Sequence, residues 1–169
     1  LGLVAGDFYL SGGSADVFAP GLGFDEDGAV YEKMSSGGNT LTEPFQFPFL
    51  ASVGDGVSYG IAPAAGDLYV PLFTASQTVA VGGGKEGDGT NARFETGTSF
   101  VYDRYFFVGH GDVGSVLDGY LEARGIPSGT VSGVVTEERS GTPLSGVDVF
   151  VYEPGAEAPF SQWETDVHP

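Results

Sequence analysis

Short runs in which hydrophobic and polar residues alternate recur along most of the chain. Phe45, Phe47 and Phe49 alternate with other residue types, which is the period of a strand with one buried face. Pro44 and Pro48 confine this strand to an edge or an irregular position, because proline cannot donate to a sheet ladder. Similar runs between glycine- and proline-rich turns predict further antiparallel strands, within residues 3–10, 17–19, 57–61, 68–73, 78–81, 92–94 and 98–108.

The period changes to that of a helix after Asp112. Hydrophobic residues then recur at steps of three and four, which predicts a helix over about 112–124 with one buried stripe. Asp112 is suited to cap its N-terminus, since a carboxylate can accept hydrogen bonds from the amides of the first turn. Gly125 can take the left-handed closing position, and Pro127 forbids continuation. The stripe consists of Val113, Val116, Leu117, Tyr120 and Leu121.

A second unit is predicted after this helix. Residues 128–129 are typical of a linker, residues 130–135 predict a strand, and residues 140–146 predict a turn. Valines then alternate with other residues over 147–152. A stretch of about 40 residues holds three strands at most, fewer than a sandwich needs to close its core. The predicted domains are residues 1–127 and residues 128–169.

Composition favours an all-β chain. The 29 glycines and 10 prolines, together with 13 phenylalanines and 8 tyrosines, indicate many short strands joined by tight turns. The sequence therefore predicts an all-β fold: an antiparallel β-sandwich with one C-terminal helix at about 112–124, followed by a partial β-sandwich.

Charge narrows the possible partners. Twenty-three acidic side chains against six basic ones give a formal charge of −17, which repels phosphate backbones and anionic lipid heads. We therefore expect no nucleic-acid partner and no membrane-surface partner. No apolar stretch approaches the ~20 residues of a membrane span, so we also expect no membrane insertion. The chain has no cysteine, so stability must rest on the core or on bound ions. Because it begins at Leu1 without a methionine or a signal peptide, we expect a processed or excised segment of a longer protein.

The stretch "GTVSGVVTEERSGTPLSGVDVFVYEPG", with "SQWETD" after it, resembles the start of the carboxypeptidase regulatory-like (transthyretin-like) β-sandwich. The matching elements are Gly133 to Val135, Gly141 to Pro143, Gly146 to Val151, and Thr165-Asp166. This resemblance implies a partial transthyretin-like or immunoglobulin-like sandwich over residues 128–169. The open edges of such a sandwich would be covered by strand addition, either by the remainder of the parent polypeptide or by neighbouring copies.

The preceding region is similar to the β-rich part that comes before such a sandwich in exported bacterial proteins. The stretches "FAPGLGFDEDG", "VSYGIAPAAGDLYVPLF" and "YDRYFFVGHGDVGSVLDGYLEARG" carry this likeness. Those proteins often continue into PHP-type metal-dependent hydrolase domains, whose metal-binding histidines lie downstream. The resemblance implies an extracellular or cell-surface location and an accessory role for this segment, with no catalytic residues of its own.

Three stretches are candidate sites of chemistry. Asp25, Glu26 and Asp27 offer clustered oxygens on a glycine-bearing loop, so they are a candidate calcium site, although the spacing of an EF-hand is missing. The stretch "GHGD" contains His110, which we interpret as a turn residue before the Asp112 cap rather than a metal ligand, because His168 is the only other histidine. The "GVSYG" stretch matches the nucleophile elbow of hydrolases, but Ser58 is predicted to be an ordinary strand serine, since no helix follows it.

Exposed aromatic residues could instead form a sugar-binding platform, although at strand spacing they are more often part of a core. The function expected from the sequence is thus a non-catalytic structural, spacer or assembly module of an exported multidomain protein. Two alternatives stay open: an accessory segment of a PHP-type hydrolase, and a carbohydrate-binding module. The candidate aromatics are Tyr102, Tyr105, Phe106, Phe107, Tyr120 and Trp163.

Overall fold

A computed structural model describes residues 6–10, 16–24, 45–74, 78–83, 96–97, 99 and 103–166. This part of the chain is mostly β, with antiparallel sheets and one short helix, which confirms the predicted fold class in that form. The predictions for residues 25–44 and 92–94 lie outside the described residues. Within the described ranges, no helix has the length and apolar character needed to cross a membrane.

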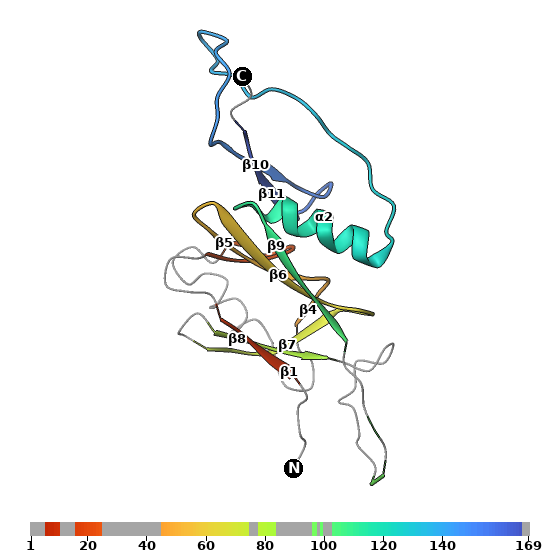
Figure 1. The fold of residues 1–169 in the computed structure, drawn as a ribbon. Coiled ribbons are helices and arrows are strands. Elements are labelled where there is room, and N and C mark those ends of the chain that lie inside the picture. Colours follow the sequence, from red (N-terminus) through yellow and green to blue (C-terminus); the bar gives the residue numbers. More distant parts are fainter. Residues whose placement is uncertain are drawn as a thin grey trace.

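A five-stranded antiparallel sheet lies at the centre of the described structure (Figure 1). The predicted strand over 98–108 is confirmed for residues 104–108, which pair with the neighbouring strand, while residues 98 and 100–102 lie outside the described part of the chain. The strands follow the order β3 (Gly23–Phe24), β2 (Asp16–Ala19), β5 (Leu50–Gly54), β6 (Val57–Pro63) and β9 (Arg104–Gly109).

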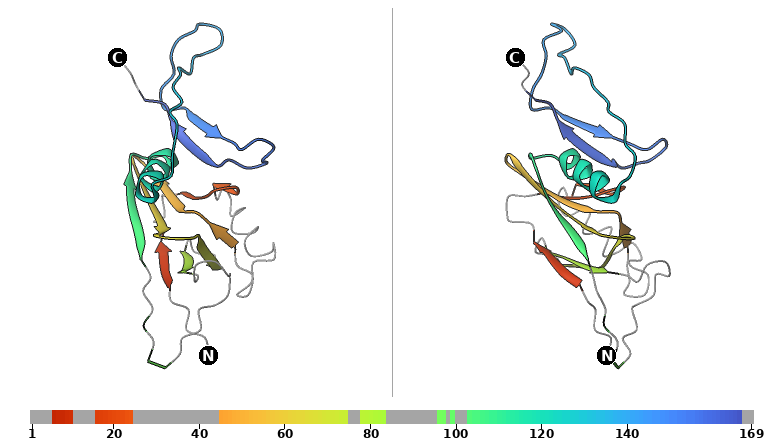
Figure 2. Two further views of the ribbon diagram at one scale, coloured as in Figure 1. Left: turned by 90° about the vertical axis from the view of Figure 1, so that its right-hand side faces the viewer. Right: turned by 45° about the vertical axis from the view of Figure 1, so that its right-hand side comes forward.

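A four-stranded antiparallel sheet lies beyond the five-stranded one (Figure 2). Its last strand, β4, is short and lies at an edge, as the prolines at its ends predicted. Phe49 no longer belongs to it: the chain bends at Pro48 and enters the other sheet at Leu50. The strands follow the order β1 (Gly6–Leu10), β8 (Thr78–Gly83), β7 (Leu68–Thr74) and β4 (Phe45–Phe47).

The helix α2 (Val113–Arg124) covers one face of the five-stranded sheet (Figures 1 and 2). Its predicted bounds and caps are confirmed: Asp112 has extended backbone angles, and Gly125 adopts the left-handed conformation with φ 62°. Arg124 donates to the carbonyls of Pro63 and Gly66, at 3.2 and 3.0 Å, which fixes the C-terminal end of the helix to the β6–β7 turn. The core between helix and sheet consists of Phe18, Phe49, Ala51, Ala62, Val113, Val116, Leu117 and Tyr120.

A third layer lies on the other side of the helix (Figures 1 and 2). It is a two-stranded hairpin of β10 (Asp148–Val151) and β11 (Ser161–Glu164), and the first of these strands confirms the prediction from the alternating valines. The strand β11 lies against α2, and Ser161 and Gln162 are buried there.

The predicted strand at residues 130–135 is wrong for this structure. The segment runs as an open arc that is not part of a sheet (Figure 1), and Val131 is 99% exposed. Only its end is paired, through the N–H of Leu144 donating to Val135 and an isolated bridge between Thr136 and Pro143. A strand forms only where a neighbouring strand completes the ladder, and no described strand lies beside this one.

Candidate functional site

The "GHGD" stretch is the turn between β9 and α2, as the sequence predicted. The carboxylate of Asp112 accepts a hydrogen bond from the N–H of Ser115 at 2.8 Å, which is N-cap geometry. Gly111 has φ 98°, and a Cβ there would come within 3.1 Å of the backbone of Gly56. The imidazole-bearing residue His110 is exposed, and its own N–H donates to the Ser115 hydroxyl.

Gly109, the other glycine of this turn, has a role that the sequence did not reveal. Of the two glycines in this stretch, only Gly111 has a positive φ. A side chain at Gly109 would collide with the hydroxyls of Ser58 and Ser115, which face each other at 3.3 Å. Gly109 is therefore required for space rather than for its backbone angles.

Replacing Asp112 with alanine should lower the free energy of unfolding by about 1 kcal/mol, since the amides at the start of α2 lose their acceptor. Asp112→Asn should retain most of the stability, because asparagine is an equally good cap. The control is His110→Ala, for which we expect no change. Urea denaturation followed by circular dichroism measures all three. Equal losses for alanine and asparagine would show that Asp112 acts by its charge and not as a cap.

Ser58 lies inside strand β6 and not on a strained turn. Its side chain is fully buried beneath the start of α2, where the Ser115 hydroxyl is its neighbour. The residues that follow it continue β6 as far as Pro63. The "GVSYG" stretch consequently has hairpin and strand geometry, in agreement with the interpretation of Ser58 as a strand serine.

The start of α2 receives a second cap from a distant part of the chain. The N–H of Val113 donates to the side-chain oxygen of Gln162 on β11 at 3.1 Å, and this bond is buried. The indole of Trp163 packs against Gly114 so closely that a Cβ there would overlap it. These contacts attach the β10–β11 hairpin to the helix. No local sequence signal marks them, because the partners are 49 residues apart.

The candidate calcium ligands Asp25, Glu26 and Asp27 lie outside the described residues, so this site stays a prediction. Within the described ranges, no three histidine or carboxylate side chains are grouped in a way that could hold a metal ion.

One carboxyl group in the described part has a perturbed pKa. At the tip of the 136–143 turn, the hydroxyl and the N–H of Ser140 hold the pKa of Glu137 below its ordinary 4.5. Because the charged form is the bonded one, this contribution to the turn is present above the ordinary value and is lost as the pH falls through the lowered pKa. The group is exposed at the surface, so its role is local to the turn.

The candidate aromatic residues divide between the core and the surface. Tyr120 is buried, Trp163 packs against the core, and Tyr102 lies outside the described residues. Phe106 is the exception among the candidates: it is 64% exposed and stacks on Tyr59, with ring centroids 5.8 Å apart. The half-buried candidates are Tyr105 and Phe107.

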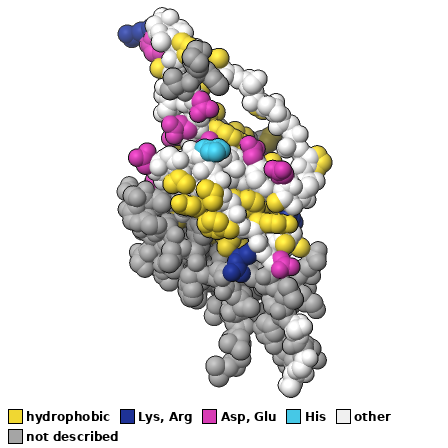
Figure 3. All heavy atoms as spheres, viewed as in Figure 1, with side chains coloured by type: hydrophobic (Ala, Val, Ile, Leu, Met, Phe, Trp, Pro, Cys, Tyr) yellow, Lys and Arg dark blue, Asp and Glu magenta, His cyan; other side chains and the backbone are white. Residues whose placement is uncertain are grey.

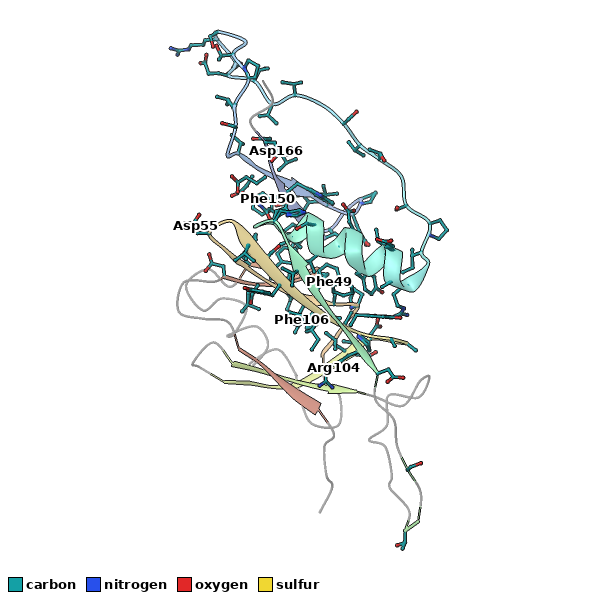
Figure 4. All side chains as sticks on the ribbon, viewed as in Figure 1. Phe49, Asp55, Arg104, Phe106, Phe150 and Asp166 are labelled. Carbon is teal, nitrogen blue, oxygen red and sulfur yellow. The ribbon has the colours of Figure 1, made fainter. Side chains whose placement is uncertain are left out.

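The stacked pair belongs to a sheet face that is only partly covered. On the face of the five-stranded sheet turned away from α2, Leu50 and Ile61 are buried, whereas Tyr59, Phe106 and Val108 are exposed. Figure 3 shows hydrophobic side chains grouped on this side of the molecule, and Figure 4 shows Phe106 and Arg104 on the same strand.

A second apolar surface lies on the hairpin and on the segment before it. All four residues of β10 are exposed, although three of them are large and hydrophobic. Such exposure is unusual for a packed domain and is typical of a surface that other polypeptide covers. The exposed hydrophobic residues of this region are Ile126, Val131, Val134, Leu144, Val149, Phe150, Val151 and Tyr152.

The chain matches no protein-family model, no curated protein and no solved structure. The resemblances to the transthyretin-like sandwich and to the region before PHP-type hydrolases therefore stay predictions from the sequence.

Proposed function

We propose that this chain is a non-catalytic structural module of an exported multidomain protein, located outside the cell or on its surface. In this proposal the two larger sheets form a β-sandwich, and residues 128–169 supply the first strands of a second, transthyretin-like sandwich. Further polypeptide completes this second sandwich by adding strands to it. The module then acts as a spacer or an assembly unit.

The contrast between two surfaces of one hairpin carries the proposal. Where β11 meets α2, Ser161 and Gln162 are buried; one strand further out, every residue of β10 is exposed. The segment at 130–135 adds a backbone without a partner strand among the described residues. An unpaired strand and an uncovered apolar face cost free energy unless other polypeptide covers them, and strand addition satisfies both.

Limited proteolysis tests this proposal. We expect thermolysin to cut the dilute chain on the N-terminal side of Val131 and Val134, while the β11 strand resists. The same bonds should resist cleavage in the protein isolated from its natural source, where the covering polypeptide is present. Equally rapid cleavage in the natural protein would contradict strand addition.

One observation favours a second candidate function, carbohydrate binding. The rings of Tyr59 and Phe106 are inclined by only 30° to each other and lie on an exposed face, an arrangement that can stack against sugar rings. Under this alternative, Phe106→Ala abolishes retention on polysaccharide columns, whereas Tyr152→Ala on the β10–β11 hairpin leaves it unchanged. Failure of the unsubstituted chain to bind any of a broad set of glycans would reject the alternative.

A further inference from the structure

The proposed function leaves open which polypeptide covers the exposed hairpin, and the structure points to a second copy of this chain. We name residues 130–135 the donor segment, and the side of β10 that faces away from β11 the acceptor edge. Both belong to the same chain: the donor segment lacks a neighbouring strand, and the acceptor edge can accept one.

The donor segment has the properties of a strand that lacks its neighbour. It runs as an open arc without helix or strand (Figure 1), and two of its three valines are exposed, Val131 at 99% and Val134 at 74%. Within the described residues, the donor segment makes one backbone hydrogen bond, in which the N–H of Leu144 donates to the carbonyl of Val135. The remaining donors and acceptors of its backbone are therefore positioned to receive a strand.

The acceptor edge is complementary to it. Among the described strands, β10 pairs only with β11. The residues Val149 and Val151 lie on one face and Phe150 lies on the other, so that a strand added at this edge would extend both faces.

The two elements are kept apart within one copy. Continuing the ladder from the Thr136–Pro143 bridge would bring the donor segment beside β10, but the chain turns away at Gly146, where φ is 66°. The N–H groups of Gly146 and Val147 both bond to Thr165, which holds β10 in the ladder with β11. Figure 1 shows the segment after α2 running in a wide arc away from β10.

Charge favours a second copy at this place. The chain carries a formal charge of −17, so most pairs of surfaces on two copies repel each other. Residues 126–136 contain no ionisable side chain, and they lack the charged residues that normally protect exposed strands from pairing. The donor segment would therefore bring no charge of its own to the acceptor edge, where Asp148 is the only ionisable residue of β10.

We propose that the donor segment of one copy adds as a strand to the acceptor edge of a second copy. The first copy then keeps a free acceptor edge and the second copy keeps a free donor segment, so the interaction is head-to-tail and produces chains of copies unless it closes into a ring. This inference rests on the proposed function and names the partner at the same surface.

The absence of cysteine from the chain allows a direct test. Three donor variants, Val131→Cys, Ser132→Cys and Gly133→Cys, are each mixed with the acceptor variant Val149→Cys under mild oxidation. Neighbouring strands place opposite Cβ atoms about 5 Å apart, close enough for a disulfide after small adjustments. We expect at least one mixture to form a mixed disulfide well above the background set by Asp67→Cys, which lies on an exposed turn, mixed with Val149→Cys.

Further variants make the result decisive. Adding Val134→Lys to the donor copy should abolish the mixed disulfide, and circular dichroism of α2 confirms that this copy still folds. Mixed disulfides at background level in all three mixtures would overturn the inference. The proteolysis test then decides the proposed function separately: protection of Val131 and Val134 in the natural protein would show that a different polypeptide covers the same surface.

Discussion

Replacing Gly60 with valine should lower the free energy of unfolding by about 1–3 kcal/mol, the usual effect of overfilling a packed core. Gly60 lies on β6 directly beneath α2, and a Cβ built there would overlap the side chain of Val116. Val116 is β-branched and fully buried on the helix, so it has no free rotamer to which it can move. The helix would have to rise from the sheet.

The sign of this effect makes it informative. In a strand that is not overpacked, valine is favoured over glycine, so a generic substitution would stabilise the protein. Gly133→Val is the control for adding the side chain itself: Gly133 lies outside the strands and nothing lies within 4 Å of a Cβ there, so we expect little change in stability. Urea denaturation of both variants measures the difference. Equal stability of Gly60→Val and the unsubstituted chain would show that the helix does not lie on the sheet at this position.

Replacing Trp163 with alanine should have an effect of similar or larger size, about 3 kcal/mol, at the lower end of the range for large aromatic residues because the ring is only partly buried. The indole packs against Gly114 and contacts the core beneath α2. Its loss removes the contact of the indole with the helix and the core, and leaves Phe160 as the other aromatic residue of the hairpin packed there. We expect the melting temperature followed by the helix signal to fall, although residue 163 lies outside the helix.

Tyr152→Ala is the control for this prediction, since Tyr152 lies just after β10 and is 51% exposed. Trp163 is also the only tryptophan, so its fluorescence in the unsubstituted chain reports on the hairpin alone. The fluorescence and helix transitions should coincide. A fluorescence transition at a temperature well below that of the helix transition would mean that the hairpin unfolds as a separate unit and contributes little to the stability of α2 and the sheet beneath it.

The elements predicted best from the sequence are those whose signals are local. The helix is an example, since its stripe, the Asp112 cap and the Gly125 closing position all lie within one short stretch. Strands between turn residues, such as β6 and β7, were also predictable to within a few residues. The segment at 130–135 shows what such local signals cannot predict. Its pattern favours a strand, but the residues of one segment do not indicate whether a partner strand will lie beside it.

The contacts that define the candidate site were harder to predict because they join distant residues. Gln162 and Trp163 reach the start of α2 across about fifty positions, and only a three-dimensional arrangement brings them there. Gly60 and Gly114 gave a partial signal, since glycines inside a strand or a helix often mark a close approach of another element. The uncovered face at Phe106 depended on how far the second sheet extends, which the pattern of one strand does not contain.

Hydrogen exchange of the dilute chain, followed by mass spectrometry of its peptides, tests the central claim most directly. The claim has two parts. The strand β11 packs against the core around α2, whereas residues 128–134, which include most of the donor segment, have no partner strand within the described chain and pair with a strand of another polypeptide. We predict slow exchange in β6, α2 and β11 together, and rapid exchange in residues 128–134. Rapid exchange in β11 while β6 stays protected, or slow exchange of residues 128–134 in a dilute monomer, would contradict it.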